Sequence, residues 1–432
     1  MWKSEYKEKL CTAAEAVKLV KSGDRVYIGT CSNVAYVLSE ALADRSEELE
    51  DVTICSGLIN RPLRIFSDPK FKHFSYFMGG TERTSLKLGT MDYHSIHLSQ
   101  FDIWCHKVAK PNVLFLEVSE PDENGYVNFS TNGTTLNTYL LGQAETIILQ
   151  VNKQVCRVFG DENTMHISKA TAIVEAADTQ IELPAIDVTP DVERLSSYVL
   201  DLIPDGATIQ LGAGRVATAI GFGLKNKNDL GIHTEMMSDS LMELMQLGVA
   251  NNSRKTYYPG KTIIGFAWGS KKLYEFLDYN EDTYFLPMTV VNNPYNIAKN
   301  DRMISVNSAS AIDLTGQVSA ETINGRQYSG IGGQLDYVRG AQMSKDGKSF
   351  IVMESTYGDV NGGKGGSRIV LNFKPGNAVT TPRSDVQYVA TEFGCVNLKE
   401  LSMQDRVRAM ISLAHPVFRD QLKDEAKAAG LL

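Results

Sequence analysis

The sequence has no long uninterrupted apolar run, and this absence sets a first limit on its function. None of its apolar stretches approaches the roughly 20 residues that a helix needs to span a bilayer. Residues 1–7 include the acidic Glu5 and are not followed by the apolar segment that a signal peptide would have. We therefore expect a cytoplasmic protein that does not bind a membrane.

Cysteine is scarce, and its spacing carries no motif. The six cysteines lie at positions 11, 31, 55, 105, 156 and 395, and no two of them form a Cys-x-x-Cys pair. Zinc ribbons and thioredoxin-like redox sites are therefore not indicated, and small buried side chains in a reducing compartment are the simpler interpretation. His94 and His97 would share one face of a helix, but no third ligand accompanies them, so we expect no metal site.

An excess of basic residues is also missing. The sequence contains 43 Lys and Arg against 51 Asp and Glu, which gives a formal net charge of −8. A nucleic acid is not an expected partner, because phosphate backbones bind to basic surfaces. An anionic substrate would need a local cationic pocket made by main-chain N–H groups, helix N-termini or a few Arg and Lys side chains.

What the sequence does contain is a repeated unit. Each half opens with a helix, a strand, a helix and a second strand. We assign these elements to residues 13–20, 25–29, 35–43 and 52–56 in the first half, and to residues 196–202, 207–211, 216–224 and 231–235 in the second. Alignment of the halves places Gly29 opposite Gly212 and Ile54 opposite Thr234, so that Cys55 matches Glu235.

The repeat predicts an α/β fold, because strand–helix–strand units build parallel sheets. A chain of 432 residues also exceeds what one hydrophobic core usually serves, so we expect two related open α/β domains with largely parallel sheets. Pro184 and Pro190 flank a short extended segment, and Thr189 is suited to cap the helix after it. We place the domains at residues 1–187 and 188–432, the second of which carries Glu235 beyond the end of a strand, where ligands of such sheets bind.

A glycine-rich turn follows the first strand of the second half. Gly212, Ala213 and Gly214 would let a phosphate approach the main chain at the start of the next helix. The segment from Gly212 to Ala217 also matches the dinucleotide pattern G-x-G-x-x-A, and Glu235 lies 21 residues after Gly214, near the position of a ribose-binding acid. A dinucleotide-dependent oxidoreductase therefore remains an alternative, as does a purely structural tight turn.

Glu235 ends the next strand and is followed by Met236 and Met237. Desolvation among such side chains raises the pKa of a carboxyl and strengthens its carboxylate as a nucleophile. Capping of the following helix and pairing with an arginine are the alternatives. His233 points to the same side of the strand, so a supporting role for it is open.

A second glycine-rich segment, with Gly330, Gly332 and Gly333, precedes a helix that we expect to begin near Asp336. Successive glycines free main-chain N–H groups to converge on an oxyanion. The alternative is a flexible turn.

These segments together resemble the acetyl-CoA hydrolase/transferase family over nearly the whole chain. The stretches that carry the resemblance occur in the same order as in the family; they are residues 118–126, 210–214, 230–236, 292–294, 314–317, 329–336, 367–370 and 414–418. Within the family the likeness is greatest to the 4-hydroxybutyrate CoA-transferases, with the butyryl-CoA:acetate enzymes next.

The resemblance implies a CoA-transferase that moves CoA between short-chain carboxylates, such as 4-hydroxybutyrate or butyrate with acetate, by ping-pong chemistry. It implies Glu235 as the catalytic residue that forms a glutamyl-CoA thioester. It also implies an active site between the two domains, a homodimer or higher homo-oligomer, and a CoA thioester as substrate with no permanently bound cofactor. The CoA-binding residues that it implies are Gly212, Ala213, Gly214, Asn292, Gly330, Gly332 and Gly333.

Two departures from the family bear on acyl specificity. Many relatives carry an aliphatic residue and a proline after the first glycine-rich turn, where this chain has Arg215, Val216 and Ala217. A Met-Pro pair of some relatives is missing near residues 151–156. An acyl-CoA hydrolase that forms the same anhydride and admits water is the alternative within the family, and a non-catalytic CoA or sugar-phosphate binding protein is a third.

Overall fold

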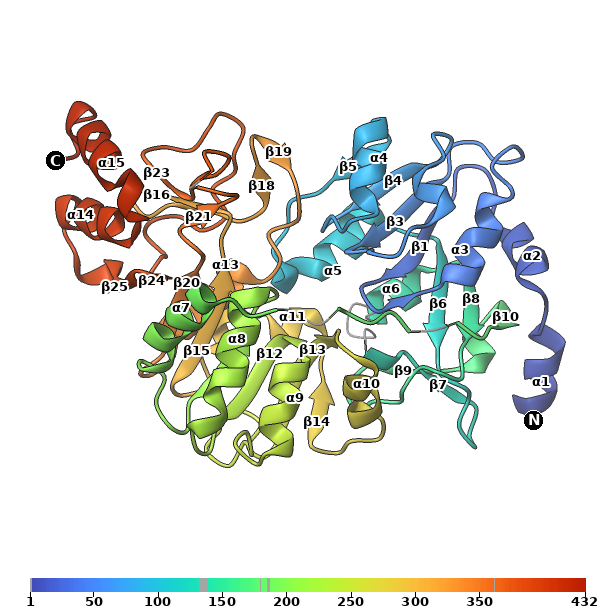
Figure 1. Ribbon diagram of the computed structural model, residues 1–432. Coiled ribbons are helices and arrows are strands. Elements are labelled where there is room, and N and C mark those ends of the chain that lie inside the picture. The colour runs from blue at the N-terminus through green and yellow to red at the C-terminus, as the bar shows by residue number, and fades with distance from the viewer. Residues whose placement is uncertain (1, 132–137, 179, 185–186, 361) are drawn as a thin grey trace. The chain divides into compact units, whose positions relative to one another are not determined.

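The computed structural model describes residues 2–131, 138–178, 180–184, 187–360 and 362–432. The chain divides into two compact units (Figure 1). The first consists of residues 1–184 and 263–290, and the second of residues 185–262 and 291–432. Segment 263–290 joins the first unit through contacts such as the hydrogen bonds from Ser32 Oγ to the Ala267 carbonyl and from the Asp161 N–H to the Phe285 carbonyl.

The first unit is built on a sheet with the strand order β10-β8-β6-β1-β3-β4-β5, in which all of these neighbours are parallel and β2 adds an antiparallel pairing to β1. The strands are β1 (Arg25–Thr30), β2 (Asn33–Val34), β3 (Thr53–Gly57), β4 (Lys72–Ser75), β5 (Met91–Tyr93), β6 (Val113–Val118), β8 (Thr146–Val151) and β10 (Ala172–Glu175). β6 is buried along its whole length, as expected of a parallel strand that is covered on both faces.

The first unit contains further helices and strands outside this sheet. They are α1 (Trp2–Lys9), α2 (Ala13–Ala16), α3 (Tyr36–Ala43), α4 (Glu82–Leu88), α5 (Phe101–Ile103), α6 (Thr138–Gln143), α10 (Lys271–Leu277), and the strands β7 (Tyr126–Asn128), β9 (Thr164–His166), β13 (Thr262–Ala267) and β14 (Thr283–Phe285). β7 and β9 pair antiparallel.

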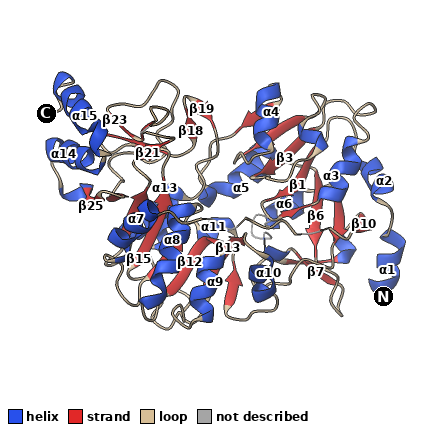
Figure 2. Cartoon of the chain, in the orientation of Figure 1, coloured by secondary structure: helices blue, strands red, loops and turns tan. Residues whose placement is uncertain are grey.

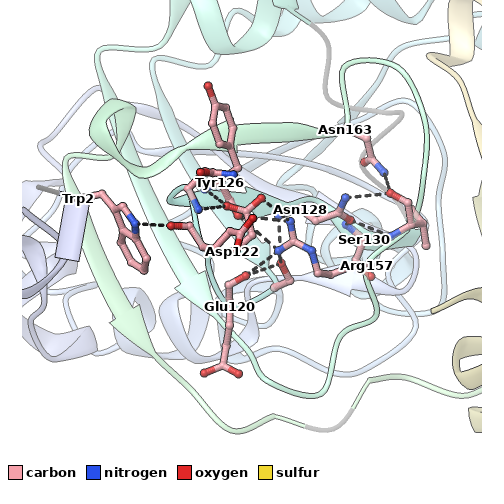
Figure 3. Close-up of polar contacts among 12 residues, drawn as sticks. Trp2, Glu120, Asp122, Tyr126, Asn128, Ser130, Arg157 and Asn163 are labelled. Atoms are coloured by element: carbon pink, nitrogen blue, oxygen red, sulfur yellow. Dashed lines mark hydrogen bonds and ion pairs between the residues drawn. The ribbon is translucent and has the colours of Figure 1, made fainter. Parts of the chain in front are cut away.

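Residues 118–126, which carry part of the family resemblance, form a tightly bonded turn before β7. The Asp122 carboxylate accepts hydrogen bonds from the N–H groups of Asn124 and Tyr126, both at 2.9 Å. Arg157 donates to Ser119 Oγ and to the Glu120 carbonyl, both at 2.8 Å (Figure 3). These contacts give the segment a structural role in the first unit.

The second large sheet has the strand order β14-β13-β12-β11-β15-β20-β24-β25, and its strands from β12 to β25 belong to the second unit. The strands in this unit are β11 (Thr208–Leu211), β12 (Gly231–Met237), β15 (Met303–Ser308), β20 (Lys348–Val352), β24 (Tyr388–Thr391) and β25 (Gly394–Asn397). The pairs among them are parallel except for β24 and β25. Figure 2 shows the alternation of strands and helices that the α/β prediction requires.

Helices and short strands complete the second unit. The helices are α7 (Pro190–Leu200), α8 (Arg215–Gly223), α9 (Asp239–Gln246), α11 (Met288–Val291, at the junction of the two units), α12 (Pro294–Ile297), α13 (Gln334–Met343), α14 (Met403–Leu413) and α15 (Pro416–Ala428). The short strands are β16 (Ala311–Asp313), β17 (Val318–Ser319), β18 (Thr322–Ile323), β19 (Arg326–Gln327), β21 (Thr356–Tyr357), β22 (Gly366–Ser367) and β23 (Ile369–Val370). No helix among the described residues has both the length and the apolar character needed to cross a membrane.

The predicted repeat and the α/β fold are confirmed. Strand order β8-β6-β1-β3 in the first unit corresponds to β20-β15-β11-β12 in the second. Thr189 caps α7, as predicted, by accepting a hydrogen bond from the Val192 N–H, although the helix begins earlier than expected, at Pro190. The domain boundary between residues 187 and 188 stays a prediction.

The predicted match between Cys55 and Glu235 is wrong by two residues. Arg25 faces Thr53 in the first sheet, and Thr208 faces Gly231 in the second. With Arg25 aligned to Thr208, the register pairs Gly57 with Glu235 and Cys55 with His233, because the loop between the two strands is five residues shorter in the second copy.

The idea of a shared helical face for His94 and His97 is also wrong. Both residues lie in an irregular segment between β5 and a short 3₁₀ helix, Leu98–Gln100. Four of the six cysteines are buried and the other two are half-buried.

Candidate functional site

The parallel strands of the second unit end at one edge of its sheet, and the candidate residues follow them there. Gly212 comes directly after β11, and Glu235 lies near the end of β12. Ser308 is the last residue of β15, and Glu354 follows β20. The chain topology therefore gathers these residues at the edge that the sequence predicted.

β12 is fixed near its start by side chains that bond to its main chain. The Ile232 N–H donates to Asn252 Oδ1 at 2.9 Å, and Lys255 Nζ donates to the Ile232 carbonyl at 2.9 Å. Lys255 is itself almost completely buried, and burial lowers the pKa of its amine to about 7. These bonds hold the strand that carries Glu235.

The Glu235 carboxyl lies between an amide and a glycine. Asn292 Nδ2 donates a hydrogen bond of 2.6 Å to Glu235 Oε2. A Cβ atom placed on Gly333 would lie 2.0 Å from Glu235 Oε2 and 2.2 Å from Asn292 Nδ2. A glycine at position 333 leaves room for this contact, and the structure brings the second glycine-rich segment and Glu235 together.

The environment of Glu235 favours its protonated form. Burial raises the pKa of the carboxyl to about 7, and the negative charge of Asp336 acts in the same direction. The hydrogen bonds from Asn292 and from the main-chain N–H of Gly333 oppose this rise in pKa. Among the described residues, the groups that lower the pKa of this carboxyl are the Asn292 amide and the Gly333 N–H, which are dipoles and not cations.

The structural alternatives for Glu235 are not observed. Glu235 caps no helix, since α9 begins after Ser238. It also forms no ion pair among the described residues, where its carboxyl bonds to an amide and a main-chain N–H. The residue as a whole is half-buried, which leaves part of it accessible to a ligand.

Asn292 is positioned from both sides along the chain. Asn293 caps α12 by accepting from the Tyr295 N–H at 3.0 Å, which fixes the main chain after it. On the other side, the Val291 carbonyl accepts a 2.8 Å hydrogen bond from His233 Nε2. Asn292 is completely buried, and its Oδ1 has no partner among the described residues.

His233 is a neutral supporting residue in this arrangement. A carbonyl oxygen can only accept, so Nε2 carries the hydrogen that bonds to Val291, and Nδ1 accepts from Asn300 Nδ2 at 3.2 Å. Burial, together with the positive charge of Lys255, lowers the pKa of the imidazole to about 3. His233 lies on the same strand as Glu235, and it holds the peptide group that precedes Asn292.

The second glycine-rich segment is a buried helix start and not a flexible turn. Gly330, Gly332 and Gly333 are buried, and α13 begins at Gln334, two residues earlier than expected. Gly332 has a φ of +62°, a conformation that favours glycine. The N-terminus of a ten-residue helix therefore faces the Glu235 carboxyl through Gly333, where it stabilises negative charge.

The first glycine-rich turn meets the same edge of the sheet. Gly214 precedes α8 with a φ of +117°, and the turn from Ala213 onward is exposed. Ser308 Oγ contacts the Ala213 carbonyl at 3.5 Å, and the Ser308 carbonyl accepts a 2.8 Å bond from Gln334 Nε2. Ser308 thus links the two glycine-rich segments.

Sequence reasoning missed Ser308 as a residue of this edge. The signal was its place at the end of the run Met303–Ser308, which reads as a buried strand followed by a polar residue. Arg215, at the departure from the family pattern, forms an ion pair of 3.7 Å with Glu354.

Comparison with known proteins identifies the family of this chain. A model of the acetyl-CoA hydrolase/transferase N-terminal domain matches residues 1–186, and a model of the corresponding C-terminal domain matches residues 269–426. The chain belongs to the acetyl-CoA hydrolase/transferase family. The resemblance predicted from the sequence is confirmed.

The family relatives that align over the full length are CoA-transferases. The chain is 38% identical to 4-hydroxybutyrate coenzyme A transferase of Clostridium kluyveri over 99% of both chains. It is also 38% identical to the butyryl-CoA:acetate CoA-transferase of Anaerostipes caccae, over 100% of this chain and 98% of the relative. Acetyl-CoA hydrolases of the family, such as that of Yarrowia lipolytica, align over 50% of this chain at 27% identity.

Solved structures support the same assignment. RipA from Yersinia pestis superposes with a TM-score of 0.93 at 34% identity, and both chains are covered completely. A 4-hydroxybutyrate CoA-transferase from Porphyromonas gingivalis superposes with a TM-score of 0.81 at 30% identity over 99% of this chain and 100% of that one. The fold of this family member is therefore the fold of its relatives.

Replacement of Gly333 by alanine should separate Glu235 from Asn292. The added methyl group would overlap both side-chain ends, so we expect turnover of acyl-CoA to fall by about 100-fold, the loss typical of a misplaced oxyanion donor. Turnover and the melting temperature would be measured together. Gly142→Ala is the matched control, because its Cβ meets open space; equal activity of the two variants would contradict the contact.

Replacement of His233 by phenylalanine should act on Glu235 through Asn292. The Val291 carbonyl would lose its 2.8 Å bond from His233 and keep only the 3.5 Å bond from the Tyr337 hydroxyl. Asn292 would then shift, and loss of the bond from Asn292 to Glu235 would raise the pKa of Glu235 further. We expect the midpoint of the pH–rate profile to move upward, and His233→Gln, which retains an N–H donor, to move it less. An unchanged midpoint in the phenylalanine variant would show that His233 serves packing alone.

Proposed function

We propose that the chain is a CoA-transferase that moves CoA between short-chain carboxylates through a covalent thioester on Glu235. The observation that carries this proposal is the position of the Glu235 carboxyl, bonded by Asn292 and lying against Gly333 without a counter-cation. Such a carboxylate is a nucleophile with hydrogen-bond donors already placed beside it.

In the first half-reaction, the Glu235 carboxylate attacks the carbonyl carbon of the acyl-CoA thioester. The carbon–sulfur bond breaks, CoA leaves as a thiolate, and a mixed anhydride remains. The thiolate then attacks the carbonyl carbon of Glu235, the anhydride carbon–oxygen bond breaks, and the first acid leaves as its carboxylate. A second carboxylate reverses these steps on the glutamyl-CoA thioester, so the thioester bond energy is conserved.

The residues around Glu235 support the charges of these steps. The N–H of Gly333 and the amide of Asn292 are placed to donate to a developing oxyanion, an effect worth about 3 kcal/mol per donor. We assign CoA contacts to Gly212, Ala213, Gly214, Asn292, Gly330, Gly332 and Gly333. The exposed turn at Ala213 and the unpartnered Oδ1 of Asn292 support this assignment.

The names of the relatives indicate which substrates to test first. We propose 4-hydroxybutyrate and butyrate as acyl groups and acetate as the second carboxylate, since the two relatives above are named for these acids. We further propose that the enzyme works in the cytoplasm as a homodimer or higher homo-oligomer, without a metal or a permanently bound cofactor, and that its domains divide between residues 187 and 188. The prolines at 184 and 190 support the division.

Water would hydrolyse the same anhydride if it reached it. The fraction of acyl-CoA that reacts with water, compared with the fraction that passes CoA to acetate, therefore distinguishes a hydrolase from a transferase. Butyryl-CoA would be supplied with and without acetate, and free CoA and acetyl-CoA would be measured. A transferase gives acetyl-CoA and little free thiol, whereas a hydrolase gives free CoA at a rate that acetate does not change. Titration with NAD beside CoA tests the dinucleotide alternative.

Substitution of Glu235 should abolish the covalent step. We expect Glu235→Ala to lose transfer completely and Glu235→Asp to lose most of it, because the carboxylate retreats by one methylene from the thioester. Intact mass after incubation with acyl-CoA alone should show a CoA adduct in the parent protein, and borohydride should reduce residue 235 to an alcohol. Glu243→Gln, on the exposed side of α9, is the control. A fully active alanine variant would remove Glu235 from the mechanism.

The raised pKa of Glu235 predicts two pH dependences. The nucleophile is the ionised form, so thioester formation should rise about tenfold per pH unit below pH 7 and level off above it. A carboxyl whose pKa is raised in the folded state stabilises the protein at low pH, and this contribution is lost as the pH rises through about 7. The melting temperature of Glu235→Gln should therefore rise relative to the parent between pH 5 and pH 8; a constant difference would contradict the pKa.

A further inference from the structure

A cavity of about 320 Å³ lies among the short strands of the second unit. Its walls come from the start of β16, from the hairpin of β18 and β19, from β21 to β23, and from residues 372–377. This volume is at the lower end of the range of small-molecule sites, about 300–1,000 Å³. The cavity lies outside the set of residues assigned above to catalysis and CoA binding.

Two cations line this cavity, and neither has an acidic partner among the described residues. Arg368 Nε donates to the Thr356 carbonyl at 3.0 Å, and Lys374 Nζ donates to Asn324 Oδ1 at 3.2 Å. No described Asp or Glu is among the residues of the wall. In a chain of net charge −8, two cations facing one hollow without a carboxylate form the kind of local positive site that phosphate groups need.

Aromatic and amide groups accompany the cations. Tyr357 lies in the wall with 53% of its surface exposed, and Phe373 also lines the cavity. Exposed aromatic rings stack on nucleobases, and such stacking is tolerant of the base. The side-chain amides of Asn324 and Asn377 add hydrogen-bonding groups. Phosphate-binding cations beside a stacking surface indicate a nucleotide as the ligand.

The cavity adjoins the edge of the sheet that carries the candidate catalytic residues. Ser310 lines the cavity, and Ser308, two residues earlier, contacts both glycine-rich segments. Two residues of extended chain span at most about 7 Å, so the cavity begins close to this edge. A ligand with a thioester at one end and a nucleotide at the other can therefore reach both places.

We propose that this cavity binds the nucleotide end of the CoA thioester, with Arg368 and Lys374 neutralising its phosphates and Tyr357 stacking on its base. The inference rests on the proposed function, because CoA is the nucleotide-bearing substrate of that reaction. The sequence predicts that an anionic substrate needs a local cationic pocket, and the proposal places that pocket at this cavity.

The test compares two substrates that differ only in the nucleotide. Lys374→Ala, Arg368→Gln and the double variant would be assayed with butyryl-CoA and with butyryl-pantetheine, which lacks the nucleotide. We expect the KM for butyryl-CoA to rise about tenfold for each lost cation, in the range typical of charge-assisted hydrogen bonds, and the loss to be confined to the substrate that bears the nucleotide. Lys423→Ala, an exposed cation on α15, is the control for lost charge.

Equal losses with both substrates, or an unchanged KM for butyryl-CoA in the double variant, would overturn the proposal. The affinity for CoA would also be measured by calorimetry on Glu235→Gln, with and without Lys374→Ala. This measurement needs no turnover, so it tests the cavity even if Glu235 is not catalytic. If the double variant does not fold, Lys374→Ala alone decides, since its side chain is exposed. An ADP-dependent change in butyryl-pantetheine turnover that Lys374→Ala abolishes, with the KM for butyryl-CoA unchanged, would assign the cavity to a free nucleotide instead.

Discussion

The site depends on the Glu235 carboxyl, which is desolvated and has no ion-pair partner among the described residues. Removing a carboxylate from water costs several kcal/mol unless hydrogen bonds or charges replace the lost solvent. Around Glu235, the replacements are the Asn292 amide, the Gly333 N–H and the N-terminus of α13. These dipoles only partly offset the cost, as the pKa of about 7 shows. An arginine in their place would stabilise the carboxylate more strongly and would weaken it as a nucleophile.

The two units share the same strand order but carry different residues at the equivalent edge of the sheet. In the second unit, the register position near the end of β12 carries Glu235; in the first, the equivalent position near the end of β3 is Gly57, against which the ring of Tyr76 packs closely. The first unit buries two carboxyls of its own, but Glu82 accepts hydrogen bonds from the N–H groups of Ile59 and Gly79, and Glu117 accepts from Gln150 and Asn152. The repeat thus supplies the sheet edge twice, and the residue at one strand position differs between the two copies.

Much of this arrangement follows from local sequence signals, and the rest from contacts between distant segments. The strand that ends near Glu235 and the turn at Gly212 could be predicted, because apolar runs and glycines mark them directly. The register of the repeat could not, since a shorter loop in the second copy shifts the alignment and leaves no mark on the strands. The bond between Glu235 and Asn292 joins residues 57 positions apart, so only the family resemblance pointed to Asn292. The cavity at Arg368 was out of reach because its walls are two-residue and three-residue strands, which are too short to show a hydrophobic period.

The proposed function places the phosphate-binding cations and the reacting carboxyl at different positions in the second unit. A cation close to Glu235 would help to bind the phosphates of CoA, but it would also lower the pKa and the nucleophilicity of the carboxylate. Phosphates close to Glu235 would have the opposite effect and would raise the pKa, as the charge of Asp336 already does. In the proposed arrangement, Arg368 and Lys374 bind the phosphates and the uncharged pantetheine arm reaches Glu235, and neither cation is among the groups that shift the pKa of this carboxyl. Charge interactions in solution fade over about 8–10 Å at physiological salt. In the proposed site the cations can therefore bind an anionic substrate, while Asn292, Gly333 and the N-terminus of α13 set the ionisation of Glu235.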